Sequence, residues 1–497
     1  MEKNALLAFI LTLLVLFFFQ FFLSPPRKVE KPPPKRQEQK ELKGETKPSK
    51  IYRIETPLLR VEISDLGGAI RSVKLKEYKE TVKSRKEKEL IEEISPYSYV
   101  PMLLWETGDD RFYFECDKEN LQVAGREEGL SCEARLPDGK TIKKVYTFHP
   151  SAYTIGFGLT TEGWEGERRV DFAAISWKGK RSYVFKGPIV YDKGLKQIDK
   201  IKDTLSYGSY KYAGFDEGYF AFLIIPEQGT PPLSLLRRGE TPVISLTMRG
   251  KELRGRLYVG PKRSDLLKSL NVQAEKIIDF GWFDFIAKPL VLWLTLTHRF
   301  TRNYGVDIII LTILIKILFY PLTLLSYKSM KEMQRLQPYI QKLREKYKDD
   351  KQRLNQELME LYRRKKINPM SGCLPILVQI PVFIALYKAL SLAIELRHAP
   401  FVLWIKDLSS PEDLYTFHVL GFSIPIRILP LIMGFTQYVQ QKMTPTSLDP
   451  MQEKIMLFMP IFFTFLFWGF SSGLVLYWLT NNVISIVQQY YINKKLR

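Results

Sequence analysis

The fold of this chain is decided by the stretch QRLNQELMELYRRKKINPMSGCLPILVQIPVFIALYKAL at residues 352–390. In its charged first part, Leu354, Leu358 and Leu361 recur at steps of three and four residues, which is typical of one face of an α-helix. Residues 373–392 are almost wholly apolar, and this length is enough to cross a bilayer as a helix. A charged amphipathic helix joined to a membrane-length apolar segment indicates an integral membrane protein with a part outside the bilayer.

Apolar segments of similar length occur before and after this stretch. The apolar run 5–23 predicts an N-terminal transmembrane anchor at 1–23. A cleaved signal peptide is the alternative, but its apolar region would be shorter and a small-residue cleavage site would follow. Together with the anchor, a core of five helices makes six transmembrane helices, the five being predicted at 306–325, 373–392, 419–438, 454–470 and 473–490.

A charged helical hairpin is predicted at 326–370, between the first two core helices, and Pro338 is expected to kink its first arm. The hairpin holds 13 Lys/Arg against 6 Asp/Glu, in a chain whose net charge is +21. Because basic loops remain in the cytosol, the hairpin and both termini are predicted to be cytosolic and residues 24–300 largely outside. The basic residues that directly follow the anchor, such as Arg27 and Lys28, would by themselves place the N-terminus outside. The larger number of basic residues in the hairpin and the other predicted inner loops favours a cytosolic N-terminus.

Residues 51–270 predict an all-β domain outside the membrane. Runs such as KKVYTF and GYFAFLII alternate or are wholly apolar, and turn residues separate them, which favours a large antiparallel sandwich. A Pro- and Lys-rich linker at 24–50 precedes this domain. After it, residues 271–300 mix Trp282 and Trp293 with isolated charges, which predicts an amphipathic helix lying in the membrane interface.

Cysteine and histidine are sparse, with 3 and 4 residues in the whole chain. None of them has the spacing of a metal site, so no metal or other cofactor is expected. Cys116 and Cys132 lie in segments that can pair as a hairpin. A disulfide and two free buried thiols both fit this pattern.

The block at 352–390 closely resembles the YidC family of membrane protein insertases. Four further motifs carry the resemblance over residues 280–497: KILFYPLT (316–323), ELRHAPFVLWIKDLS (395–409), DPMQEKIMLFMPIFFTFLF (449–467) and SGLVLYWLTNNVISIVQQ (472–489). The resemblance implies a bacterial inner-membrane protein with a helical insertase core at 301–497. It also implies that the outer β-domain is a β-supersandwich related to sugar mutarotases. Such a protein inserts and folds membrane proteins, alone or with the Sec translocon, and is not an enzyme.

In this family, a polar groove in the membrane is open to the cytosol and attracts the polar tail of an incoming segment. Lys316 is expected to be its central residue, where the family usually has arginine. Near the middle of a straight helix 306–325, its charge would need water or a carboxylate, or it would be neutral. Hydrogen bonding between helices is the alternative role for the polar groups, and ordinary packing for the aromatic ones. The expected groove residues are Thr312, Lys316, Tyr320, Gln379, Phe383, Gln437, Gln441, Tyr477, Trp478, Asn481 and Ser485, with Thr323, Gln440, Asn482 and Gln488 beside them.

Two other classes of function compete with the insertase. An ion or solute transporter could use Lys316, but it would leave the charged hairpin without a role. A mutarotase-type enzyme needs acid–base residues, and His149 is the one histidine of the β-domain. The expected partners are nascent membrane proteins, the Sec translocon, the ribosome through the hairpin, and lipid, with no specific nucleic acid.

Overall fold

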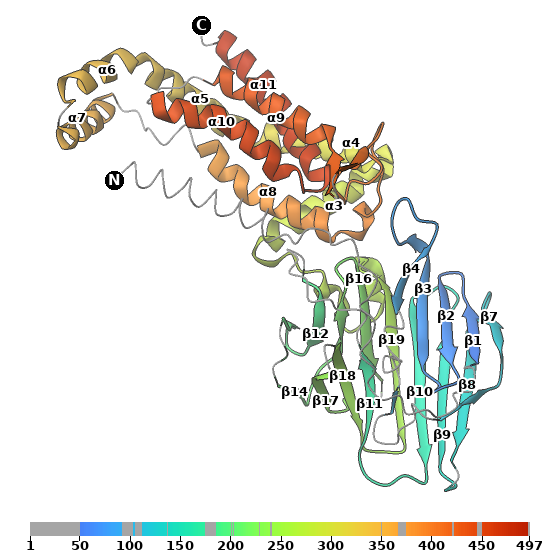
Figure 1. Ribbon diagram of the computed structural model, residues 1–497. Coiled ribbons are helices and arrows are strands. Elements are labelled where there is room, and N and C mark those ends of the chain that lie inside the picture. Colours follow the sequence, from blue (N-terminus) through green and yellow to red (C-terminus); the bar gives the residue numbers. More distant parts are fainter. Residues whose placement is uncertain are drawn as a thin grey trace. The chain divides into compact units, whose positions relative to one another are not determined.

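The computed structural model describes residues 50–91, 103–104, 112–136, 138–173, 185–199, 201, 203–227, 229–238, 241–348, 350–365, 374–419, 422–444 and 450–495. The expected anchor at 1–23 and nearly all of the expected linker at 24–50 lie outside the described residues. The described chain consists of a β-domain followed by a helical part (Figure 1).

Among the described residues, three sheets form the β-domain, and their pairings are antiparallel except that of β1 with β7. The first sheet has the order β4 (Glu87–Ile91), β3 (Ile70–Lys79), β2 (Leu59–Ser64), β1 (Ile51–Glu55), β7 (Asn120–Gln122). The second has the order β13 (Leu195–Gln197), β12 (Gly187–Tyr191), β15 (Tyr212–Asp216), β16 (Phe220–Pro226), β19 (Glu252–Pro261), β10 (Thr154–Glu162), β9 (Thr141–Phe148), β8 (Glu128–Arg135), β6 (Glu115–Cys116). The third has the order β14 (Leu205–Tyr207), β17 (Leu233–Arg238), β18 (Thr241–Met248), β11 (Arg168–Ala173), β5 (Leu103–Leu104).

Alternation along the strands builds one hydrophobic core from all three sheets. On β10, Ile155, Phe157 and Leu159 are buried while the residues between them are partly exposed. The same core contains Val61 of the first sheet and Leu246 of the third. The alternation of apolar and polar residues that predicts the strands therefore also decides which side chains face the core and which face outward.

Cys116 on β6 lies directly opposite Cys132 on β8, with their Cα atoms 3.9 Å apart. The two residues are joined by a disulfide. Of the two alternatives that the sequence left open, the structure therefore has the disulfide, and the antiparallel register explains how residues 16 apart come to face each other.

A short helix and two 3-10 turns lead from the β-domain into the helical part: α2 (Ser264–Ser269), η2 (Ala274–Ile277) and η3 (Gly281–Phe283). The amphipathic helix expected within 271–300 is α3 (Asp284–Thr301). Its residues Ala287 and Leu294 are buried, whereas Phe300 is 89% exposed and Trp282, just before the helix, 93%. This separation of exposed aromatic and buried aliphatic residues suits a helix at a membrane interface.

The expected straight helix 306–325 is wrong. The chain instead forms α4 (Tyr304–Leu318) and α5 (Tyr320–Arg335), which meet at an angle of 60°. Pro321 lies in the first turn of α5 and cannot donate a backbone hydrogen bond to Ile317, so the helix of α4 ends before it. In the described part of the chain, no other helix or helix pair is long and apolar enough to cross a membrane, and α4 and α5 meet that test only together. The number of six transmembrane helices stays a prediction.

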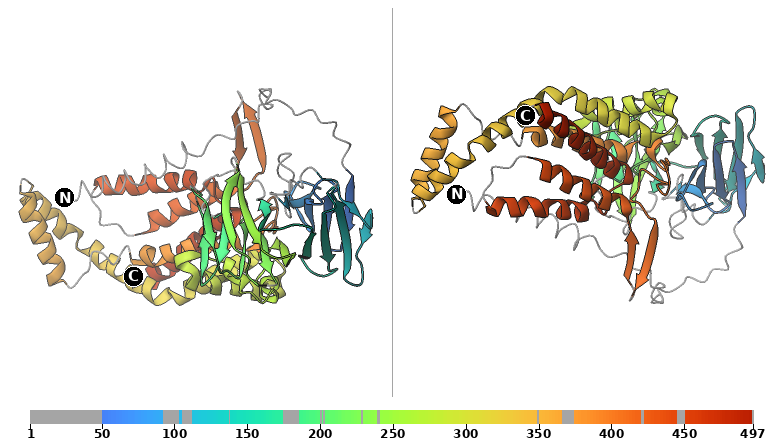
Figure 2. Two further views of the ribbon diagram at one scale, coloured as in Figure 1. Left: turned by 90° about the horizontal axis from the view of Figure 1, so that it is seen from below. Right: turned by 90° about the horizontal axis from the view of Figure 1, so that it is seen from above.

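The remaining helices include the charged hairpin. α5 continues into α6 (Gln337–Lys346), with a break at Leu336 that agrees with the expected effect of Pro338, and α7 (Lys351–Arg364) packs back on α6. α8 (Leu374–Leu392) and the turn η5 (Ile394–Leu396) follow, then α9 (Ile428–Met443), α10 (Pro450–Phe467) and α11 (Ser472–Lys495). α9 packs against both α10 and α11, and α11 also packs against α4 (Figures 1 and 2).

The expected helix 419–438 is wrong over its first part. A two-stranded ribbon, β20 (Tyr415–Val419) and β21 (Phe422–Ile426), occupies this region, and α9 begins only at Ile428 (Figure 2). Pro425 disfavours the helical conformation of Ile424 before it, and the β-branched residues around it suit a strand.

Candidate functional site

Lys316 and Ser485 connect the last turn of α4 to the second half of α11. The Nζ atom of Lys316 donates a hydrogen bond to Oγ of Ser485 at 2.7 Å, and the same hydroxyl donates to the backbone oxygen of Asn481 at 2.7 Å. Ser485 and Asn481 are buried, whereas Lys316 is half-buried. In the described residues, no carboxylate lies within ion-pair distance of Lys316, so its ammonium is held by a neutral acceptor.

A second contact extends this polar side of α11 toward α5. The hydroxyl of Tyr327 donates to Oε1 of Gln489 at 3.4 Å, and both residues are buried. Tyr477, Asn481, Ser485 and Gln489 follow one another at four-residue steps, so they share a face of the helix. The sequence prediction used Gln488 instead and missed Gln489, although the four-residue spacing indicated it.

The expected single face Thr312–Lys316–Tyr320–Thr323 is not formed. Thr312 is buried and its hydroxyl donates to the backbone oxygen of Ile308. Tyr320 and Thr323 lie beyond the bend, on α5, where Tyr320 is exposed and the Thr323 hydroxyl donates to the Phe319 oxygen. The 60° bend therefore separates residues that a straight helix would have aligned.

Two of the expected apolar groove residues lie in an aromatic cluster. The ring centroid of Trp478 is 5.1 Å from Phe383, 5.0 Å from Phe467 and 5.6 Å from Phe463. These distances are those of favourable aromatic pairs. Phe383 and Trp478 thus hold α8, α10 and α11 together, which is the packing role that the sequence left open for them.

Two groups of amides in the helical part differ in their surroundings. Asn482 on α11 donates to the Met433 oxygen at 3.3 Å and to the Thr436 hydroxyl at 3.4 Å on α9, so it is a bond between helices. A second group is half-buried, and in the described part of the chain Oε1 of Gln437 and of Gln488 has no hydrogen-bond partner. A buried polar atom without a partner is costly, so such atoms favour a region that admits water or a polar ligand. The half-buried amides among the expected groove residues are Gln379, Gln437, Gln440, Gln441 and Gln488.

The start of α4 is fixed by a polar network that the sequence did not reveal. Asp307 is fully buried, accepting from Thr301 Oγ1 at 2.6 Å and lying 3.0 Å from His298 Nδ1 on α3. Asn303 caps the helix, because its Oδ1 accepts from the backbone N–H of Gly305 and Val306. These contacts join the end of α3 to the start of α4.

Comparison with known proteins decides the family. The family model described as 60Kd inner membrane protein matches residues 296–497, and that described as YidC periplasmic domain matches residues 51–293. The membrane protein insertase YidC of Geobacter metallireducens is 40% identical over 474 residues, which are 90% of this chain and 86% of that protein. The chain belongs to the YidC family of membrane protein insertases. YidC of Geobacter sulfurreducens is likewise 41% identical over 468 residues, 89% of this chain and 86% of that protein.

Among solved structures, an active YidC insertase with its first transmembrane domain resolved aligns with 99% of this chain and 100% of its own. The identity is 20% and the TM-score 0.42. Membership of the YidC family makes the chain an inner-membrane insertase with a periplasmic domain, and not an enzyme. It gives no support to the transporter or to the mutarotase-type enzyme.

Proposed function

We propose that this chain inserts membrane proteins through a polar site between α4, α5 and α11, centred on Lys316. The observation that carries the proposal is the Lys316–Ser485 hydrogen bond at 2.7 Å. An ammonium has three donors, and this bond occupies one. In the part of the chain that the structure describes, the other two have no protein acceptor and are available to water or to a polar group of an incoming chain.

The position of Lys316 makes such a site useful. It lies in the last turn of α4, between the apolar residues Ile315 and Ile317. An uncompensated charge that faces lipid at the bilayer centre costs at least about 3 kcal/mol. Contact with water removes that cost. A hydrated cavity with a positive charge would attract the polar or acidic tail of a client and shorten its path through hydrocarbon.

The proposed partners follow from the same arrangement. Nascent membrane proteins are the clients, and exposed apolar side chains on α10, such as Phe458, Ile461 and Phe465, suit contact with lipid or with a client's apolar segment. The hairpin at 326–370, which contains α6 and α7, carries the excess of basic residues and is proposed to receive chains at the ribosome. The Sec translocon is proposed as a second partner. The charge distribution favours cytosolic termini.

Site-specific photo-crosslinking tests the proposal. A photoreactive residue at Asn481, on the polar face of α11, should crosslink to the translocated segment of an arrested client. The matched control is Phe465, which is 52% exposed on α10 and should contact mainly the client's apolar segment or lipid. Equal crosslinking of the polar segment from both positions would contradict a polar route along α11.

A further inference from the structure

The two-stranded ribbon of β20 and β21, which stands between α8 and α9, has two unlike faces. In its register, four apolar or aromatic residues share one face: Tyr415 opposite Ile426, and Phe417 opposite Ile424. The other face carries Thr416, whose hydroxyl donates to Oδ1 of Asp413 at 2.9 Å. The ribbon is therefore amphipathic.

The apolar face of the ribbon is left open by the part of the chain that the structure describes. Tyr415 is 59% exposed and Phe417 48%, although their rings contact each other with centroids 4.8 Å apart. A two-stranded ribbon is at best marginally stable in water unless another element packs on its hydrophobic face. A surface outside the described chain is therefore needed to complete it.

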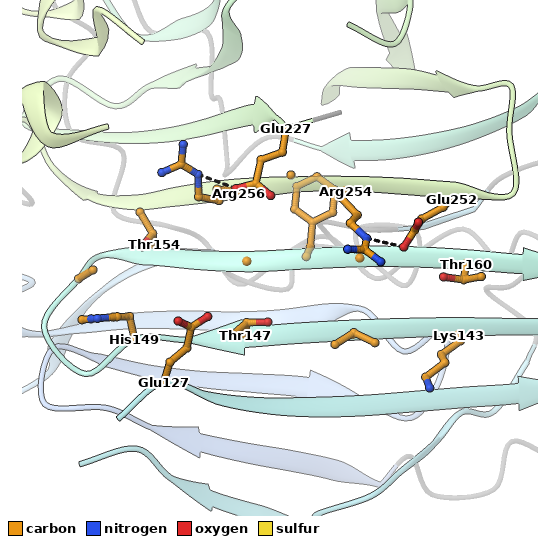
Figure 3. Close-up of a pocket in the computed structure, with 16 residues that line it drawn as sticks. Glu127, Lys143, Thr147, His149, Thr154, Thr160, Glu227, Glu252, Arg254 and Arg256 are labelled. Atoms are coloured by element: carbon orange, nitrogen blue, oxygen red, sulfur yellow. Dashed lines mark hydrogen bonds and ion pairs between the residues drawn. The ribbon is translucent and has the colours of Figure 1, made fainter. Parts of the chain in front are cut away.

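The strand faces of the β-domain show what this protein exposes to water. Charged side chains, such as Lys143 on β9 and Glu252 and Arg254 on β19, line a pocket on the outer face of the second sheet (Figure 3). None of the four positions on the apolar face of the ribbon is charged. The ribbon therefore has the chemistry of an element at the boundary between lipid and water.

Polar contacts fix the base of the ribbon at the first turn of α9. Before β20, the Glu412 carboxylate accepts from the backbone N–H of Ile428 at 2.6 Å and of Leu429 at 2.8 Å. After β21, Nε of Arg427 donates to the backbone oxygen of Glu412 at 2.9 Å. Figure 2 shows the ribbon, in orange, projecting sideways from this point, across the direction of α9 and α10. The ribbon therefore lies along the membrane surface when α9 crosses the bilayer as predicted.

An apolar side of α9 follows directly after the ribbon in the chain. Leu431, Ile432 and Phe435 are exposed, and their spacing places them on one side of the helix. Because the chain belongs to an inner-membrane family, this side of α9 suits contact with lipid tails. Aromatic residues at the end of such a helix form the pattern of an aromatic belt, in which the rings lie at the level of the lipid headgroups.

A second apolar projection comes from the turn before Glu412. Leu403 is 83% exposed and has a φ of 55°, in the left-handed region that leucine rarely adopts. The next residue, Trp404, donates from Nε1 to the Glu412 carboxylate at 2.8 Å. The turn is thus held beside the same glutamate that fixes the ribbon. Packing does not explain why an exposed leucine keeps this conformation, whereas contact with lipid does.

We propose that Leu403, Tyr415, Phe417 and Ile426, which we call the outer rim, lie in the headgroup region of the outer leaflet and bind the lipid surface. The face with Thr416 is then turned to water, and the rim fixes the depth of the start of α9. α8 leads from the hairpin to the loop that contains the rim, so the rim lies at the opposite end of α8 from the hairpin. The choice of the outer leaflet rests on the cytosolic hairpin of the proposed function.

Fluorescence quenching in vesicles tests the proposal. Cys373→Ser removes the one thiol outside the disulfide, and a single cysteine at Phe417 or Leu403 then carries an NBD label. The purified full chain is reconstituted into vesicles of phosphatidylethanolamine and phosphatidylglycerol. A nitroxide on the lipid headgroup should quench both labels several-fold more than a label at Thr416, the matched control on the polar face. A label at Phe435, quenched by a nitroxide in the acyl chain, confirms reconstitution.

Three results of this experiment would contradict the rim. Equal quenching at Phe417 and Thr416, or none at Phe417 and Leu403 in vesicles where the Phe435 label is quenched, would overturn the proposal. Quenching at only one of the two rim positions would contradict a shared rim. Client insertion by the same vesicles separates this proposal from the proposed function: normal insertion without quenching at the rim overturns the rim alone, whereas quenching without insertion counts against the proposed function.

Measurements in native membranes distinguish lipid from a protein partner. A photoreactive residue at Tyr415 of the full chain should give phospholipid adducts, detected by mass spectrometry, and one at Thr416 should give few. A discrete protein adduct as the main product at Tyr415 would show that a protein covers the rim and would overturn the proposal. In spheroplasts, a membrane-impermeant maleimide should label Thr416→Cys. Labelling only in inverted membrane vesicles would place the rim on the inner side and overturn its assignment to the outer leaflet.

Discussion

The ammonium of Lys316 and the hydroxyl of Ser485, 2.7 Å apart, join two helices whose contacting residues are 169 positions apart in the chain. The Ser485 hydroxyl donates its hydrogen bond to the backbone oxygen of Asn481, so its lone pairs remain free to accept from the lysine. The hydrogen bond positions the ammonium of Lys316 without neutralising its charge. Substitutions at Lys316 can therefore test what the charge contributes to insertion.

Reversing the charge at Lys316 should impair insertion. Lys316→Glu and Lys316→Ala are expected to lower insertion of clients with acidic translocated tails about tenfold or more, since about 1.4 kcal/mol corresponds to a factor of ten. Lys316→Arg should retain insertion, and Ser485→Ala should have a smaller effect because the charge remains. Protease protection of the translocated tail measures the result. Full insertion by Lys316→Glu at normal protein levels would refute the electrostatic role.

Removing α6 and α7 should abolish insertion while the rest of the protein stays folded. The two helices share a small apolar cluster with the end of α5, in which Leu358 and Leu361 of α7 pack against Met333, Leu336 and Ile340. The deletion should leave α5 intact, because Tyr327 on α5 is buried against Gln489. Insertion assays combined with limited proteolysis check both parts. A folded protein that lacks α6 and α7 and still inserts clients normally would rule out the proposed role of the hairpin.

The periplasmic domain should be dispensable for insertion itself. The polar site lies on α4, α5 and α11, whereas the three sheets are built from strands that end at Pro261. A chain that lacks residues 51–261 is expected to complement loss of the full protein in growth and to insert a short-tailed client. Complete loss of both activities, at normal protein levels, would show that the domain takes part in insertion.

The disulfide between Cys116 and Cys132 should stabilise the β-domain. It closes a loop of 16 residues, for which the chain-entropy account gives about 3 kcal/mol. Serine at both positions should therefore lower the midpoint of urea unfolding of this domain. Alkylation of the denatured protein before and after reduction counts the thiols. Two reactive thiols before reduction, in protein isolated from the periplasmic side, would show that the bond does not form.

Glu412 should be important for the stability of the helical part. Its carboxylate accepts from Trp404 Nε1 at 2.8 Å and from the backbone N–H of Ile428 and Leu429 at the start of α9. Glu412→Ala leaves three donors without this acceptor and should cost about 2 to 4 kcal/mol, measured by thermal unfolding in detergent. Glu360→Ala, which breaks an exposed pair with Arg364 on the hairpin, is the control and should change stability by less than about 0.5 kcal/mol. Similar losses in both variants would contradict the capping role.

Much of the architecture could be predicted because it is local. Periodic patterns in the sequence indicated the strands of the β-domain, the amphipathic α3, the hairpin and the polar face of α11. Such a period depends only on residues that are close together in the chain. The motifs between 316 and 489 likewise indicated the family, because each is a short continuous stretch of sequence and they follow one another in the family's order.

The tertiary structure alone decided which of these faces meet. That Lys316 bonds Ser485, that Asn482 bonds α9 instead of lining the site, and that Glu412 caps α9 all depend on the packing of helices far apart in sequence. The 60° bend after α4 and the ribbon before α9 could have been predicted, because Pro321 and Pro425 are sequence signals for a helix end and for an extended segment. The prediction of helices at 306–325 and 419–438 followed the apolar content of these segments and disregarded the two prolines. Hydropathy measures how well a segment tolerates lipid and carries no information on its direction, whereas the direction of α4 and α5 determines which polar groups share a site.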